Sequence, residues 1–181
     1  MTIPNLLSLA RMGLIPLFIL AVLEGNPARA LLVFGVAGLS DALDGFIARF
    51  WNQRSALGAY LDPMADKLLL VSAYVVLAIP GVVKGTPVPV WVAALVITRD
   101  VVIVVVALVL YLANGISRFQ PSVLSKVNTG VQVLTVLLVL LSGVSAEFEA
   151  PALVAVYLVA VFTLASGIDY IRLTHRMAGK R

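Results

Sequence analysis

The chain has 181 residues, of which 61% are hydrophobic and only 12% are charged, with a mean hydropathy of +1.07. A soluble domain carries charge on about a quarter of its residues, so this composition excludes an ordinary water-soluble protein and predicts an integral membrane protein. The net charge of +4 is attributed to membrane topology rather than to a nucleic-acid surface. Cysteine is absent, which excludes disulfides and thiolate metal sites.

Six apolar segments follow one another along the chain, each close to the about 20 residues that a membrane-spanning helix needs. Short stretches rich in turn-forming residues separate them. The chain contains no internal repeat and no long linker, so residues 1–181 are expected to form a single domain. The fold class expected is an all-α integral membrane protein with six transmembrane helices. The segments are approximately Leu6–Leu23, Ala30–Phe50, Tyr60–Ile79, Val88–Leu112, Val123–Leu141 and Ala152–Leu173.

The distribution of basic residues predicts the orientation. Most lysines and arginines outside the segments lie in three places: the loop between the second and third segments, the loop between the fourth and fifth segments, and the C-terminal tail. The opposite loops carry only Arg29 and Lys84 as basic residues, together with three glutamates. By the positive-inside rule both termini face the cytoplasm. The first segment is expected to remain in the protein, because it has no small-residue cleavage site and further spans follow it.

Four aspartates in the second and third segments are the most informative feature. Asp41 and Asp44 are three residues apart, and Asp62 and Asp66 are four apart, so each pair shares one face of a helix. The short loop between the segments brings both pairs together at their cytoplasmic ends. An Asp in the middle of a membrane helix costs about 2.5–3.5 kcal/mol, and carboxylate oxygens are ligands for hard divalent cations. We therefore expect a polar metal-binding pocket at the cytoplasmic side.

Small residues accompany the first pair of aspartates. Gly45 and Ala48 fall on the same face as Asp41, where they leave room for a ligand to approach the helix. The alternative is close packing between membrane helices, which small residues also favour. Their position between Asp44 and Arg49 favours the ligand. Arg49 is either a cytoplasmic anchor or a phosphate-binding residue.

The order Asp41-x2-Asp44-Gly45-x2-Ala48-Arg49-x8-Gly58-x3-Asp62-x3-Asp66 matches every position of a family signature. The chain resembles the CDP-alcohol phosphotransferases, whose six-span plan also fits. The resemblance implies that an alcohol displaces CMP from a CDP-linked donor at a metal site on the cytoplasmic side. It implies that Asp41, Asp44, Asp62 and Asp66 bind divalent metal (Mg²⁺ or Mn²⁺, two ions expected) and that Asp66 also deprotonates the hydroxyl. The donor-binding residues expected are Asp41, Gly45, Ala48, Arg49, Ser55 and Gly58, although Gly58 alone could be a turn glycine.

The choice of alcohol depends on other stretches. The opening Ile3–Arg11 resembles both phosphatidylglycerophosphate synthases and cardiolipin synthases of the mitochondrial type. Asn52–Gly58, Thr98–Val101 and Ser125–Gln132 resemble the latter. This resemblance implies a cardiolipin synthase, with CDP-diacylglycerol as donor, phosphatidylglycerol as acceptor, and cardiolipin and CMP as products. The alternative is phosphatidylglycerophosphate synthesis from glycerol-3-phosphate, whose dianionic phosphate would demand a more basic pocket than one with Asn128 in place of lysine.

Three residues are expected on the acceptor side. An intramembrane arginine is a functional candidate by default, and Arg99 or Lys126 could neutralise the phosphate of phosphatidylglycerol. Asn128 is the third candidate. Each has an alternative: an internal ion pair with Asp100 for Arg99, a cytoplasmic anchor for Lys126, and an interhelical hydrogen bond for Asn128.

The expected surroundings follow from this reaction. Both lipid substrates enter sideways from the bilayer, no nucleic-acid partner is expected, and the resemblance implies a homodimer. Mitochondrial members carry an N-terminal extension and a longer segment before Ser125, which this chain lacks, so the bacterial inner membrane is expected rather than the mitochondrial one. The distant alternative is an ion carrier or channel. It predicts carboxylates spread across the membrane depth, whereas the four aspartates cluster on one side.

Overall fold

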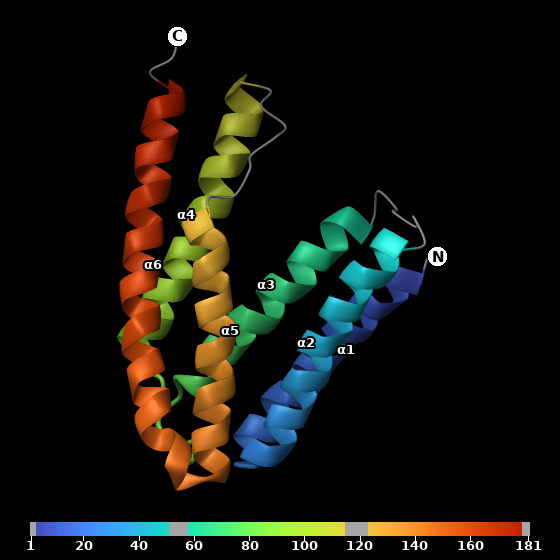
Figure 1. Ribbon diagram of the computed structural model, residues 1–181, viewed down its shortest axis with the longest axis vertical. Coiled ribbons are helices and arrows are strands. Elements are labelled where there is room, and N and C mark those ends of the chain that lie inside the picture. The colour runs from blue at the N-terminus through green and yellow to red at the C-terminus, as the bar shows by residue number, and fades with distance from the viewer. Residues whose placement is uncertain (1–2, 51–57, 115–122, 179–181) are drawn as a thin grey trace.

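Figure 1 shows a computed structural model of the chain, which describes residues 3–50, 58–114 and 123–178. Side chains are described for 9–40, 64–106, 123–170 and 172. This part of the chain is all-helical, and a helix lies over each of the six predicted segments. The elements are α1 (Ile3–Leu23), α2 (Pro27–Phe50), α3 (Gly58–Leu77), α4 (Val90–Asn114), α5 (Val123–Val144), the 3-10 turn η1 (Ala146–Phe148) and α6 (Glu149–Ala178).

The turn between α1 and α2 shows why the first helix ends where it does. Gly25 has a φ of 64°, a left-handed conformation that glycine adopts without strain. Its N–H donates to the carbonyl of Val22 (2.9 Å) and that of Asn26 to the carbonyl of Ala21 (3.0 Å), which is a Schellman motif. The side chain of Asn26 then accepts a hydrogen bond from the Arg29 N–H at 3.1 Å. α2 therefore begins at Pro27, three residues before the predicted segment, because proline suits the first helical position.

The connection between α3 and α4 packs against the end of α5. Gly85 has a φ of 93°, and a Cβ at this position would lie 2.6 Å from the backbone carbonyl of Ser142. The Ser142 hydroxyl accepts a hydrogen bond from the Thr86 N–H at 3.0 Å. This close approach requires a residue without a side chain, and it joins a loop to a helix that lies more than fifty residues away in sequence.

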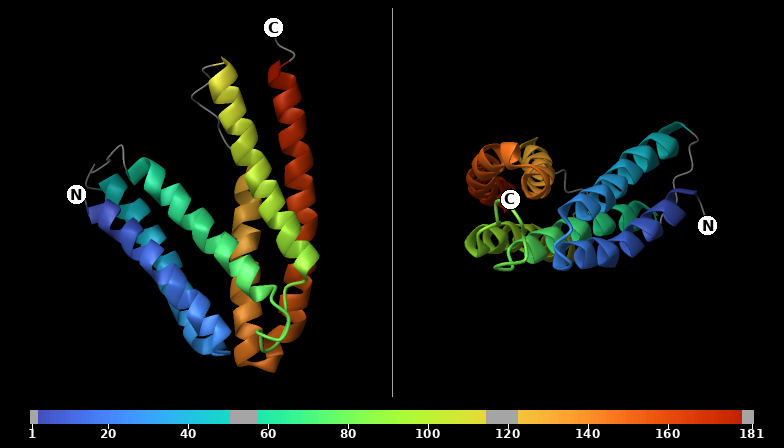
Figure 2. Two further views of the ribbon diagram at one scale, coloured as in Figure 1. Left: turned by 180° about the vertical axis from the view of Figure 1, so that it is seen from behind. Right: turned by 90° about the horizontal axis from the view of Figure 1, so that it is seen from below.

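The helices form two groups. In the first group α1 packs against α2 and α3, and in the second α6 packs against α4 and α5. The two groups are joined by contacts of α2 with α5 and of α3 with both α4 and α5. Figures 1 and 2 show that the groups lie close together at the end holding the α1–α2 and α5–α6 turns, and diverge toward the other end. Apolar side chains from all six helices make one buried cluster, in which the rings of Phe18 and Phe34 lie 5.7 Å apart.

Two stretches of the described chain are long and apolar enough to cross a membrane, Val123–Val144 and Ala146–Tyr170. Many large apolar side chains are at least half exposed on the outer faces, among them Leu32, Val104 and Val161. Such surfaces are typical of proteins in contact with lipid. The protein therefore has the character of a membrane protein, and its arrangement as six spans stays a prediction.

Candidate active site

The signature residues lie at the end where the two groups of helices diverge. The C-terminal half of α2 carries Asp41 through Arg49, and the first turns of α3 carry Gly58, Asp62 and Asp66. These two helix ends lie near the N-terminus of α1 (Figure 1). The backbone thus brings both pairs of aspartates to the same end of the molecule. Among these residues the structure describes the side chain of Asp66 alone; Ser55 and the other signature side chains lie outside the described residues.

Asp66 forms an ion pair with an arginine that sequence reasoning did not single out. Arg11 of α1 donates from Nη1 to Asp66 Oδ1 at 2.5 Å. The arginine side chain is fully buried, whereas that of Asp66 is 40% exposed. The pair therefore holds the carboxylate while a substantial part of the Asp66 side chain stays exposed. The signal available in the sequence was an arginine inside an apolar segment, which is a functional candidate by itself.

Asp66 lies at the edge of a cavity of about 120 Å³ between α2, α3 and α5. The walls are otherwise apolar or small, with Ala37 and Gly38 from α2 and Thr129 from α5. A carboxylate at the edge of a cavity can accept a proton from a hydroxyl group bound there. The cavity also shows that α5, which carries no signature residue, contributes to this end of the protein.

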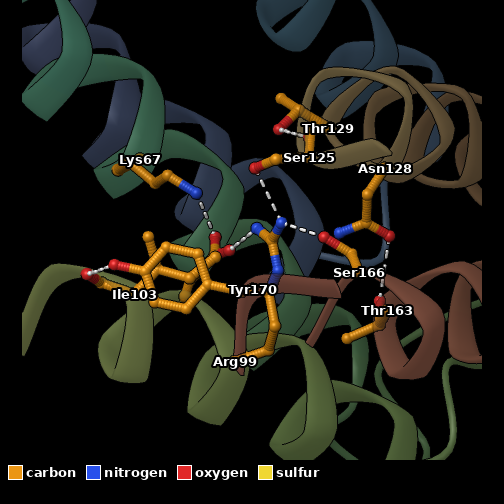
Figure 3. Close-up of polar contacts among 10 residues, drawn as sticks. Lys67, Arg99, Ile103, Ser125, Asn128, Thr129, Thr163, Ser166 and Tyr170 are labelled. Carbon is orange, nitrogen blue, oxygen red and sulfur yellow. Dashed lines mark hydrogen bonds and ion pairs between the residues drawn. The ribbon is translucent and has the colours of Figure 1, made fainter. Parts of the chain in front are cut away.

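A second group of charged residues joins four helices (Figure 3). The buried carboxylate of Asp100 accepts hydrogen bonds from two cations: Lys67 Nζ of α3 at 2.5 Å and Arg99 Nη1 at 2.7 Å. Arg99 Nη2 also donates to the Ser125 hydroxyl of α5 at 2.8 Å and to the Ser166 hydroxyl of α6. Buried charges need such pairing, because an unpaired ion in an apolar interior is very unfavourable.

Asn128 continues this polar region along α5. Its side-chain oxygen accepts a hydrogen bond from the Thr163 hydroxyl of α6 at 3.2 Å, so it links two helices. Its Nδ2 has no hydrogen-bond partner among the described residues, and neither have the amide atoms of Gln132 one turn further along. Buried polar groups are rarely left in this condition, so these amides are candidates for contact with water or with a ligand.

The three predicted acceptor residues are thus placed differently. Arg99 and Asn128 belong to one polar region. Arg99 binds Ser125, which lies one turn from Asn128 on α5, and both residues contact hydroxyl groups of α6, those of Ser166 and Thr163. Both residues also show the contact that was predicted as the alternative to acceptor binding. Arg99 forms an ion pair with Asp100, and Asn128 forms a hydrogen bond between two helices. Lys126 is exposed on the first turn of α5. Binding of an acceptor stays a prediction for all three. Sequence reasoning missed Lys67, although it directly follows the last signature aspartate.

The donor set determines which metal would fit the signature residues. Within the described side chains, no group of three or more His, Asp or Glu could hold a metal ion. Of the four signature aspartates, only Asp66 belongs to that part of the chain. Its carboxylate is partly exposed at the edge of a cavity, which leaves it accessible to a cation. Four carboxylates are hard oxygen donors, which suits Mg²⁺ or Mn²⁺ rather than a thiolate-preferring ion.

A family model described as CDP-alcohol phosphatidyltransferase matches residues 1–166. A human protein named cardiolipin synthase (CMP-forming) is 42% identical over 153 residues, covering 75% of this chain and 48% of the human protein. A Drosophila melanogaster protein named probable cardiolipin synthase (CMP-forming) is 34% identical over 192 residues, covering 97% of this chain and 58% of that protein.

Another relative, which carries a different name, aligns with this chain over a larger share of its length. The protein of Haemophilus influenzae named CDP-diacylglycerol–glycerol-3-phosphate 3-phosphatidyltransferase is 32% identical over 173 residues, covering 94% of this chain and 91% of that protein. By contrast, the chain spans about half the length of the human protein.

Proposed function

The chain belongs to the CDP-alcohol phosphatidyltransferase family, and from this premise we propose that it is a cardiolipin synthase. The reaction proposed transfers the phosphatidyl group of CDP-diacylglycerol to the free glycerol hydroxyl of phosphatidylglycerol and releases cardiolipin and CMP. The observation that carries the proposal is the 42% identity to the human protein named cardiolipin synthase (CMP-forming). The Drosophila relative with the corresponding name supports it over 97% of the chain.

The proposed chemistry is a direct displacement. The acceptor hydroxyl attacks the phosphorus on the diacylglycerol side of the pyrophosphate, an O–P bond forms, and the bridging O–P bond breaks so that CMP leaves with the bridging oxygen. Asp66 takes the proton of the attacking hydroxyl, which its partly exposed position beside a cavity supports. Two Mg²⁺ or Mn²⁺ ions held by Asp41, Asp44, Asp62 and Asp66 would supply neutralisation of charge on the phosphate oxygens.

The donor and acceptor are assigned to different helices in this proposal. The cytidine diphosphate would be held by the signature residues of α2 and by residues between α2 and α3. Arg99, Lys126 and Asn128 would bind the acceptor, which the polar region shared by Arg99 and Asn128 supports. The donor-side residues proposed are Asp41, Gly45, Ala48, Arg49, Ser55 and Gly58.

We extend the proposal to the setting of the enzyme. A single domain with six membrane spans would lie in the bacterial inner membrane as a homodimer, with both termini in the cytoplasm. The turns between α1 and α2 and between α5 and α6 lie at the opposite end of the molecule from the diverging helix ends, which supports termini on one common side (Figure 1).

A second function remains a specific alternative, because the Haemophilus influenzae relative named CDP-diacylglycerol–glycerol-3-phosphate 3-phosphatidyltransferase covers 94% of the chain. The deciding experiment supplies the purified protein with CDP-diacylglycerol and Mg²⁺ or Mn²⁺, and with either phosphatidylglycerol or glycerol-3-phosphate. CMP release and the lipid product are measured. Cardiolipin formed only with phosphatidylglycerol is the expected result. A phosphatidylglycerophosphate product formed only with glycerol-3-phosphate would replace the proposed acceptor.

A further inference from the structure

A groove of about 490 Å³ lies between α4 and α6, away from the helices that carry the signature. Its volume lies within the about 300–1,000 Å³ of ordinary ligand pockets. The lining is mainly aliphatic, and three of its side chains, Val102, Leu164 and Ile168, are between 43% and 55% exposed. A groove with such walls on the outer face of a membrane protein is accessible to the hydrocarbon chains of the bilayer.

Among the described residues that line this groove, Arg99 is the charged one. Its side chain is only 6% exposed, and its Nε has no hydrogen-bond partner among the described residues. Within the described side chains, this pairing also leaves a surplus of positive charge, because Lys67 and Arg99 share the carboxylate of Asp100. A buried cation with a spare donor favours an anion, and an arginine suits the phosphate of a lipid headgroup.

We propose that the groove between α4 and α6 binds one acyl chain of the acceptor phospholipid, with Arg99 at the groove facing the acceptor's phosphodiester. This inference rests on the proposed function and identifies the surface that recognises its acceptor as a lipid. The acceptor is favoured over CDP-diacylglycerol because α4 and α6 carry no signature residue, whereas the donor is expected beside α2 and α3. Glycerol-3-phosphate has no acyl chain and would leave the groove unused.

Gly167 provides a way to fill the groove without disturbing the packing. It lines the groove, and a Cβ built on it meets no atom within 4 Å. Gly167→Leu therefore places a side chain in the space that the acyl chain would occupy. Gly35→Leu is the matched control: this glycine also lies within a helix, its Cβ would also enter open space, and it is on α2 instead of at the groove.

The experiment measures CMP release in mixed micelles while dioleoyl-phosphatidylglycerol and CDP-diacylglycerol are varied in turn. Gly167→Leu is expected to raise the apparent KM for phosphatidylglycerol by about tenfold and to leave the KM for CDP-diacylglycerol unchanged. Gly35→Leu should change neither. A raised KM for CDP-diacylglycerol would assign the groove to the donor, and unchanged values for both lipids would mean that no substrate uses it. Either result overturns the inference.

A binding measurement separates this inference from the proposed function. Native mass spectrometry of the detergent-solubilised protein would count bound phosphatidylglycerol with phosphatidylcholine as the neutral competitor. Wild type should retain phosphatidylglycerol, and Gly167→Leu should lose it. Wild-type protein that releases no CMP with phosphatidylglycerol would reject the proposed function itself. A change in oligomeric state caused by Gly167→Leu in lipid-free detergent would instead show that a second copy of the chain covers the groove. If Gly167→Leu does not fold, Gly167→Ala is measured by the same two assays with the same expected direction.

Discussion

The guanidinium of Arg11, fully buried in α1, lies 2.5 Å from the carboxylate of Asp66 in α3. Fifty-five residues separate the two along the chain. This ion pair holds the last signature aspartate in a fixed position while 40% of its side chain stays exposed. An arginine outside the signature therefore acts on the residue proposed as the base.

Replacement of Arg11 tests this relationship. Arg11→Met should lower the free energy of unfolding by about 1–3 kcal/mol, because it removes a buried cation that is paired with the Asp66 carboxylate, and it should also lower turnover. Arg11→Lys should restore part of both. Thermal unfolding in detergent and CMP release are the measurements. Arg29→Met is the control, because the pair of Arg29 with Glu24 is exposed on both sides and should contribute about 0–1 kcal/mol. Equal effects for the two methionine variants would contradict the special role of Arg11.

Asp66→Asn separates proton transfer from binding. The amide keeps the size of the side chain but cannot accept the proton, so turnover should fall by about 10²–10⁴-fold. Binding of CDP-diacylglycerol in the presence of Mg²⁺ should largely survive, and equilibrium binding of the labelled donor measures it. Loss of donor binding in this variant would show that Asp66 acts mainly as a metal ligand.

The Asp100 ion pairs should contribute unequally to stability. Asp100→Asn leaves two cations without their shared carboxylate and should cost about 3–5 kcal/mol, because breaking a buried pair leaves uncompensated charge. Lys67→Met should cost about 1 kcal/mol or less, because Lys67 is 40% exposed and Asp100 keeps Arg99. Chemical or thermal unfolding of both variants gives the comparison. A Lys67→Met effect as large as that of Asp100→Asn would disprove the proposed order.

Gly85 should be required for the contact between the α3–α4 loop and α5. Gly85→Ala combines an unfavourable positive φ with a Cβ 2.6 Å from the backbone of Ser142, and we expect a loss of about 1–3 kcal/mol. Gly81→Ala is the matched control, since Gly81 also has a positive φ but open space around its Cβ. We expect Gly81→Ala to lose less stability, and the difference between the two variants gives the steric contribution of the contact with Ser142. Indistinguishable melting temperatures for the two variants would show that the loop moves freely away from α5.

Several features were predictable from the sequence because they depend on neighbouring residues. The order and approximate extent of the helices follow from apolar length, since a segment in lipid must satisfy its backbone hydrogen bonds internally. The end of α1 at Leu23 agrees with the predicted segment, and the turn at Gly25 explains it. The start of α2 was predicted three residues too late, at Ala30, because the suitability of Pro27 for the first helical position was not used. The spacing of the signature aspartates identified the family, and the family model confirms this identification.

The contacts between distant side chains were decided only by the tertiary structure. Arg99 contacts Ser166 of α6, Lys67 contacts Asp100, and Arg11 contacts Asp66. In each of these pairs the two residues are more than thirty positions apart in the sequence. The sequence by itself determined where helices form and which of them carry the signature residues. The structure decided which helix faces meet, because the side chains of all six helices must pack together at once, and that packing selects the partner of each buried charge.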